Sequence, residues 1–157
     1  MNDAHSIEVL NRLLAIQYRS LPMYLIDARP ESGAGERAAA VLAAIVTAQQ
    51  NLTGRIAELI LDRRGSIEPG EYPMEFTNTH LVALDFLVTE IIHYQRQDVR
   101  AIERCSLELA DDPAGRALAE ESLGTARAHL EMLEELLRQP HPPAIAGRVE
   151  PAPAPSY

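Results

Sequence analysis

The sequence of 157 residues has one cysteine, no tryptophan and no lysine, and aromatic residues make up only 4% of it. The single Cys105 excludes an intramolecular disulfide and a cysteine-ligated metal cluster, and we interpret it as a buried, inert thiol. A net charge of -9 and few aromatic side chains argue against nucleic-acid binding, which depends on clustered basic residues and base stacking. We therefore expect no nucleic-acid partner.

Long apolar runs and familiar catalytic motifs are also absent. No apolar stretch approaches the roughly 20 residues that a membrane span requires. Residues 1–8 are polar and acidic, unlike a secretory leader. The sequence contains no glycine-rich phosphate loop, nucleophile elbow, Cys-x-x-Cys or His-Glu-x-x-His motif. We expect a cytoplasmic protein that does not interact with membranes. Because these catalytic motifs are absent, the sequence gives no support to an enzyme.

Apolar residues at helical spacing dominate what the sequence does contain. Its 46% apolar and 24% charged residues are typical of a globular protein, and we expect one domain over residues 1–139. Apolar positions recur with a period of 3.6 over about residues 6–28, 35–64, 79–110 and 113–139. Residues 140–157 are rich in proline without such a period, which predicts an extended or disordered tail.

The segments between these helices predict how the helices are connected. Pro22 lies inside the first helix, so a kink or break is expected near Arg19. Gly65 stands where a C-terminal cap of the second helix is expected, and Asp111, Asp112 and Pro113 form a cap and first turn for the fourth. Residues 65–78 are too long for a tight hairpin, which favours a crossover. The prediction is an all-α antiparallel four-helix bundle with a long crossover between helices 2 and 3.

Two segments resemble a known family. NRLLAIQYRSLPMYLIDAR and IVTAQQNLTGRIAELILDRRG are similar to the first and second helices of bacterioferritins and related ferritin-like proteins, such as rubrerythrins. The resemblance covers residues 6–139, through pattern more than identity. It implies a ferritin-like bundle that forms a homodimer. It also implies a di-iron centre, which takes one Glu from each of two helices and a Glu-x-x-His pair from each of the other two.

Carried over residue by residue, most of the family's iron ligands are missing from this chain. In chain order, the six ligand positions fall on Gln17, Gln49, Leu52, Leu87, Ala126 and His129. Only His129 retains the family's residue type, and one neutral imidazole with two amides cannot balance the charge of two iron ions. The resemblance therefore implies a degenerate di-iron site, with Gln17, Gln49 and His129 as weak metal candidates.

A shift of three residues in the third helix adds two further metal candidates. Glu90 then replaces Leu87, and Glu90 and His93 have the spacing of a Glu-x-x-His pair. The apolar stripe that contains Leu84, Leu87 and Ile91 turns Glu90 and His93 toward a flank, which favours solvated side chains. The sequence leaves open whether Glu90 and His93 are metal ligands or solvated side chains.

A neutral polar core is the other expectation at the centre of the helices. Five polar side chains face inward by their spacing: Gln17, Tyr24, Gln49, Tyr94 and His129. Each buried polar group without a partner costs about 1 to 3 kcal/mol, so we expect these groups to bond to one another or to a trapped water.

Two classes of function follow from these expectations. The first is a non-catalytic ferritin-like protein without a cofactor, which acts as a binding or interaction module and forms a homodimer; the sequence does not identify a protein partner. The alternative is a divergent metal-binding protein that uses iron or another divalent metal, either in iron handling or as a di-iron oxidoreductase. Carboxylates that converge on His129 would favour the alternative.

Overall fold

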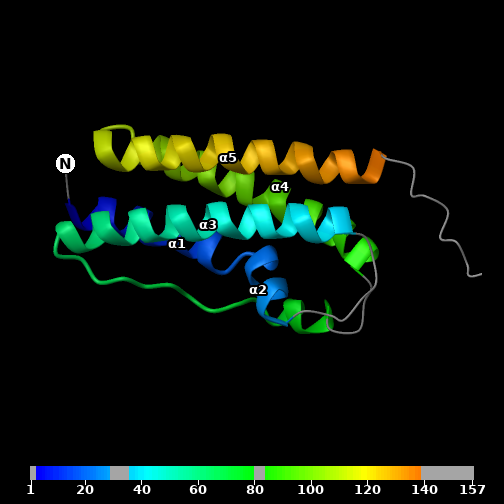
Figure 1. Ribbon diagram of the computed structural model, residues 1–157. Coiled ribbons are helices and arrows are strands. Elements are labelled where there is room, and N and C mark those ends of the chain that lie inside the picture. Colours follow the sequence, from blue (N-terminus) through cyan, green and yellow to red (C-terminus); the bar gives the residue numbers. More distant parts are fainter. Residues whose placement is uncertain (1–2, 29–35, 80–83, 139–157) are drawn as a thin grey trace, which may run out of the picture.

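The structure is a computed structural model that describes residues 3–28, 36–79 and 84–138 (Figure 1). These residues contain helices and no strand, which confirms the all-α prediction. The elements are α1 (Asp3–Tyr18), α2 (Leu21–Ala28), α3 (Glu36–Asp62), the 3₁₀ helix η1 (Met74–Thr79), α4 (Leu84–Glu108) and α5 (Pro113–Arg138). None of the helices described is long and apolar enough to cross a membrane. The segment between the first and second predicted helices and the predicted tail lie outside the described residues.

The four long helices α1, α3, α4 and α5 lie side by side (Figure 1). Helix α1 packs against α3 and α4, and α5 packs against the same two helices. Helices α1 and α5 run in one direction and α3 and α4 in the other (Figure 1). Side chains from all four helices therefore face one another along the interior.

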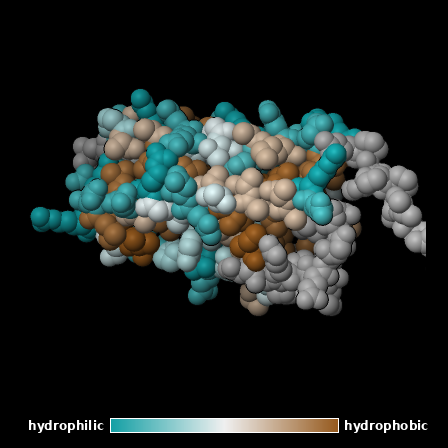
Figure 2. Space-filling view, in the orientation of Figure 1, coloured by the Kyte–Doolittle hydropathy of each residue, from teal (hydrophilic) through white to brown (hydrophobic). Residues whose placement is uncertain are grey.

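Buried apolar side chains form two clusters inside these helices. One includes Leu10, Leu14, Ile56, Ile102 and Leu109. The other includes Leu21, Leu42, Ile45, Leu87 and Leu133. Full burial of each Leu or Ile contributes about 1.5 to 3 kcal/mol, so the two clusters supply most of the driving force for folding. On the face in Figure 2, hydrophilic residues cover much of the surface and apolar residues appear between them.

The first predicted helix is broken near Arg19, as expected from Pro22. Helix α1 ends at Tyr18 and α2 begins at Leu21, because Pro22 has no N–H to donate to the carbonyl of Tyr18 and its ring would clash with that carbonyl. Ser20 caps the new helix: its hydroxyl accepts a hydrogen bond from the N–H of Met23 at 3.2 Å. The break thus starts a second short helix at a new angle (Figure 1).

The cap of α3 differs in detail from the prediction. Arg64, with φ 60°, takes the left-handed conformation expected of Gly65. The N–H of Arg64 bonds to the carbonyl of Leu61 at 2.9 Å and that of Gly65 to the carbonyl of Ile60 at 2.9 Å, which is a Schellman motif. A Cβ on Gly65 would lie 2.8 Å from Cγ2 of Ile7, so the glycine is required for close packing rather than for its backbone angle.

The segment after α3 crosses back along the helices, as the sequence predicts (Figure 1). The Asn11 side chain holds it to α1: its amide nitrogen donates to the carbonyl of Ser66 at 2.9 Å and its oxygen accepts from the N–H of Glu68 at 2.8 Å. The Arg19 side chain donates to the carbonyl of Gly70 at 2.9 Å. The segment then forms η1, where no helix was expected, and α4 begins at Leu84 rather than near residue 79.

Candidate functional site

A polar layer at the centre of the helices contains a cavity of about 10 Å³. Its lining residues come from α1, α3, α4 and α5 and are Ile16, Gln17, Gln49, Leu52, Gln95, Asp98, Ile102, Ser122, Thr125, Ala126 and His129. A volume of about 10 to 15 Å³ on this scale is the space of one water molecule. The cavity therefore has room for one water molecule or one species of similar size.

Five of the six ligand positions carried over from the ferritin-like pattern line this one cavity. They are Gln17, Gln49, Leu52, Ala126 and His129. The sixth assignment, Leu87, is wrong, because Leu87 is buried in the apolar cluster with Leu21 and Leu42. The residue of α4 that faces the cavity is Gln95, eight positions later, with Asp98 one turn beyond it.

The other metal candidates of the third helix lie away from the cavity. Glu90 and His93 are exposed, and neither lines the cavity. The His93 ring is 3.1 Å from the Gln97 side-chain nitrogen, one turn along the same helix. These two side chains do not join His129.

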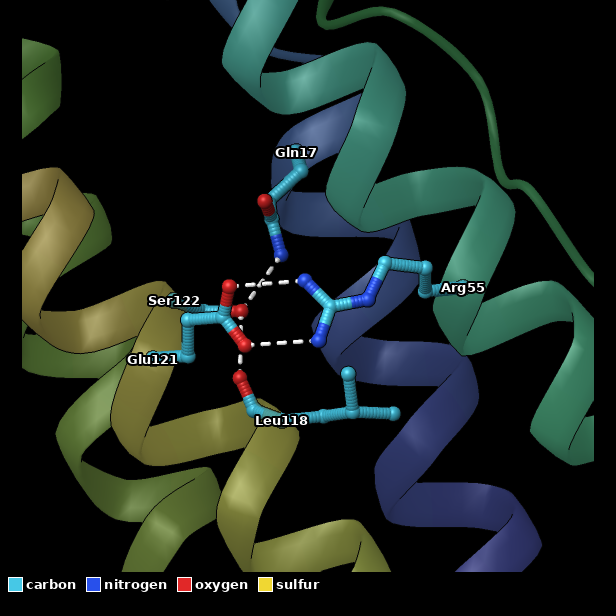
Figure 3. Close-up of polar contacts among 5 residues, drawn as sticks. All are labelled: Gln17, Arg55, Leu118, Glu121 and Ser122. Carbon is cyan, nitrogen blue, oxygen red and sulfur yellow. Dashed lines mark hydrogen bonds and ion pairs between the residues drawn. The ribbon is translucent and has the colours of Figure 1, made fainter.

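Hydrogen bonds hold most amides of the polar layer in place. Gln17 donates to the hydroxyl of Ser122 at 3.1 Å, and that hydroxyl donates to the carbonyl of Leu118 at 2.7 Å (Figure 3). The Ser20 hydroxyl donates to the side-chain oxygen of Gln49 at 2.7 Å. Both glutamines predicted for the polar core are thus buried and bonded, but to serine hydroxyls rather than to each other.

An ion pair on the surface lies beside this layer. Arg55 of α3 and Glu121 of α5 form two hydrogen bonds of 2.7 Å (Figure 3). The pair raises the pKa of Arg55 and lowers that of Glu121 through these hydrogen bonds. Both side chains are exposed, so water screens their attraction, and the pair serves to align α3 with α5.

Three groups at the cavity, Gln95, Asp98 and His129, carry polar atoms that no described residue bonds to. Gln95 is 2% exposed; its nitrogen donates to the carbonyl of Ala126 at 3.0 Å, but its oxygen has no hydrogen-bond partner among the described residues. Burial raises the pKa of Asp98 to about 7, and burial lowers the pKa of His129 below its usual value. No described residue forms a hydrogen bond or ion pair with Asp98 or His129. At this cavity the buried oxygen of Gln95 is therefore an acceptor without a donor among the described residues.

The two tyrosines of the predicted polar core lie elsewhere. Tyr24 packs edge-on against Tyr72 with ring centroids 5.2 Å apart, and Tyr94 packs against Phe76 at 5.1 Å. The Tyr94 hydroxyl donates to Glu75 at 2.7 Å, and this bond raises the pKa of Tyr94 to about 12. Tyr24 and Tyr94 thus belong to an aromatic group formed with the crossover and η1.

Sequence reasoning missed Gln95 and Asp98, although a signal for them was present. Ile91, Gln95, Asp98 and Ile102 follow one another at spacings of four, three and four, which is one buried stripe of a helix. The polar members of that stripe face His129 across the cavity. The stripe continues past Tyr94 and includes both residues.

Comparisons of the chain with protein-family models, with curated proteins and with solved structures find no significant match.

The residues at the cavity do not fit a di-iron centre. The donors are one imidazole, one carboxyl and three amides, where two iron ions require several anionic oxygens. Among the residues that the structure describes, no three His, Cys, Asp or Glu side chains gather in one place suited to a metal. The arrangement is instead a layer of neutral polar side chains with a single, half-buried carboxyl, that of Asp98.

Proposed function

We propose that this protein is a ferritin-like four-helix bundle that has lost its di-iron centre and acts as a non-enzymatic binding or interaction protein. The directions of the helices support this proposal, because α3 and α4 run the same way and are joined by a segment that crosses back along the helices (Figure 1). A bundle with one long crossover has this connection. The short helix α2, which follows the break in the first predicted helix, does not add a layer to the bundle.

The main support for the proposal is the set of residues that line the central cavity. Five positions of the ferritin-like ligand pattern converge there, and with Gln95 they present one imidazole, three amides and two apolar side chains. Carboxylates at these positions would repel one another without metal, whereas neutral amides bond to Ser20, Ser122 and a backbone carbonyl. The scaffold is thus stabilised without the ions that such a site holds.

Aerobic incubation with Fe²⁺ tests the loss of the di-iron centre. We expect less than two iron ions per chain by elemental analysis and no oxygen uptake above that of free Fe²⁺, since carboxylate bridges are missing. The His129→Ala variant should also bind fewer than two iron ions per chain and take up no oxygen above that of free Fe²⁺. Two bound iron ions per chain, with oxygen uptake that His129→Ala abolishes, would establish the oxidoreductase alternative and overturn the proposal.

We further propose that the partner includes a second copy of the chain. The outer face of α4 supports this, because Phe86 is 65% and Leu107 is 71% exposed at its two ends. Burial of such side chains against another copy is favourable by about 25 cal/mol per Å². Sedimentation of the wild-type protein should give a dimer, and Phe86→Glu with Leu107→Glu should give a monomer of unchanged helix content. A wild-type monomer at all concentrations contradicts the dimer.

A further inference from the structure

The buried oxygen of Gln95 requires a positively charged or donating partner, and two further acceptor groups line the same cavity. The side-chain oxygen of Gln95 is buried and unpaired, and a buried carbonyl in this state costs about 1 to 3 kcal/mol. Among the residues that the structure describes, no basic side chain bonds to the Asp98 carboxyl. His129 is 8% exposed and, as a neutral imidazole, keeps one ring nitrogen as an acceptor.

These three groups line the same small space. Gln95 and Asp98 are one turn apart on α4, and His129 comes from α5. Gln95 is held in orientation by its hydrogen bond to the carbonyl of Ala126, which also belongs to α5. The nitrogen of Gln95 is thus occupied, and its oxygen is the free end of the amide.

A surface groove next to the cavity is lined by acidic side chains. The groove, of about 300 Å³, shares Ile16 and Asp98 with the cavity, so the Asp98 side chain stands between the two spaces. Glu71 and Glu75 line the groove, with Arg19 as its basic residue. The Arg19 guanidinium lies over the Tyr18 and Tyr72 rings, 4.4 and 4.8 Å from their centroids, and donates to a backbone carbonyl. Acidic walls concentrate cations at such an opening.

We propose that the cavity binds one divalent transition-metal ion through the His129 imidazole, the Asp98 carboxylate and the side-chain oxygen of Gln95. An imidazole beside oxygen ligands favours Zn²⁺ and its first-row neighbours over Ca²⁺ and Mg²⁺, which take oxygen ligands. A cavity of about 10 Å³ accommodates one ion and not two. The mixed set therefore suits a mononuclear site.

The proposed ion goes beyond the proposed function, because a binding or interaction role requires no metal. It also explains why a carboxyl without a counter-charge lies next to three amides and an imidazole inside the helices. Loss of a di-iron centre and gain of a single-ion site are separate properties. If the protein does not bind Zn²⁺, only the proposed single-ion site is overturned. If it binds two iron ions, the proposed function is overturned.

Calorimetric titration of the metal-free protein with Zn²⁺ tests the site. We expect one Zn²⁺ per chain, about 100-fold weaker binding in His129→Leu and in Asp98→Asn, and about 10-fold weaker binding in Gln95→Met, since even outer-shell partners contribute 10- to 100-fold to metal affinity. Titration with Co²⁺ adds a spectroscopic measurement. His129→Leu should change the visible absorption of bound Co²⁺, because it removes the nitrogen ligand.

A control variant distinguishes the cavity from the surface. Glu90→Gln with His93→Ala removes an exposed carboxylate and imidazole that have the spacing of a metal motif, and this variant should bind Zn²⁺ as the wild-type protein does. Circular dichroism confirms that each variant is folded. Absence of saturable Zn²⁺ binding, wild-type affinity in both His129→Leu and Asp98→Asn, or loss of binding only in the control variant overturns the proposal. Absence of binding would assign the cavity to a single water.

Discussion

Asp112 caps a helix and forms an ion pair, with a further hydrogen bond to the Ser6 side chain, so its replacement should destabilise the protein. Asp112 is 4% exposed, and its carboxylate accepts a hydrogen bond from the N–H of Gly115 at 3.1 Å, which caps α5. The Arg63 guanidinium donates to both carboxylate oxygens, and this pair lowers the pKa of Asp112. The contact ties the end of α3 to the start of α5.

The expected loss of stability follows from how far Asp112 and Arg63 are buried. Loss of an N-cap costs about 1 kcal/mol. An exposed ion pair contributes about 0 to 1 kcal/mol and breaking a buried one costs about 3 to 5. The Arg63 side chain is 21% exposed and keeps part of its hydration, so we expect about 1 to 2 kcal/mol from the pair. Asp112→Ala should therefore cost about 2 to 3 kcal/mol, and Asp112→Asn, which keeps the cap, about 1 to 2.

Urea unfolding monitored by circular dichroism measures both variants. With a slope of roughly 2 kcal/mol per M, the midpoint should fall by about 1 to 1.5 M in Asp112→Ala and by about half as much in Asp112→Asn. Glu121→Gln, which breaks the exposed pair with Arg55, serves as the control and should leave the midpoint nearly unchanged. Equal shifts in the Ala and Asn variants, or a shift in Asp112→Ala no larger than the control's, would refute the reasoning.

The pH dependence of the same contact has a definite sign. Because the folded protein lowers the pKa of Asp112, the pair stabilises the protein above the unfolded value of about 4, and the stabilisation is lost as the pH falls through the folded value. The difference between wild-type and Asp112→Asn should thus be constant near neutral pH and shrink below about pH 4.

Three further substitutions test other contacts, each by urea unfolding. Gly65→Ala should lower the free energy of unfolding by about 1 to 3 kcal/mol, because the new Cβ would lie 2.8 Å from Cγ2 of the stiff Ile7 side chain; an unchanged midpoint would show that Ile7 moves freely. Ser20→Ala should cost about 1 to 3 kcal/mol, since it removes the cap of α2 and leaves the oxygen of Gln49 unpaired, and a cost below about 0.5 kcal/mol contradicts both roles. The folded protein raises the pKa of Asp98 to about 7, so it binds a proton more tightly than the unfolded chain between about pH 4 and 7, and stability falls as the pH rises through that window. In the presence of a chelator, Asp98→Asn should remove about 2 to 4 kcal/mol of this pH dependence; the same slope in both proteins would contradict the buried state of the carboxyl.

Local rules predicted several features well because few residues decide them. Pro22 removes a helical hydrogen bond wherever the helix packs, so the break near Arg19 could be predicted and is confirmed. The same holds for Asp112 and Pro113, which begin α5 as expected. The end of α3 was predicted to within a few residues, but the left-handed position fell on Arg64 because the close approach of Ile7 determines where Gly65 lies.

The composition of the central cavity could be predicted only in part. Gln17, Gln49 and His129 lie on regular stripes of their helices, and the spacing correctly placed them in the interior. The register of α4 could not be chosen in the same way, because Leu87 and Gln95 are both on its buried side. Only the position of α4 along its neighbours decides which of the two faces His129.

The sequence by itself determined that the chain is helical, where most of its helices begin and end, and which side of each helix is buried, because these properties depend on residues within one or two turns. Tertiary structure alone decided which buried polar groups meet. Asp98, Gln95 and His129 share a cavity, and Tyr24 and Tyr94 join the crossover instead, because the packing of four helices sets how each slides against the others. When one helix slides along its neighbours, the periodic pattern of its own sequence does not change. The position of a helix along its neighbours therefore cannot be predicted from the sequence of that helix alone.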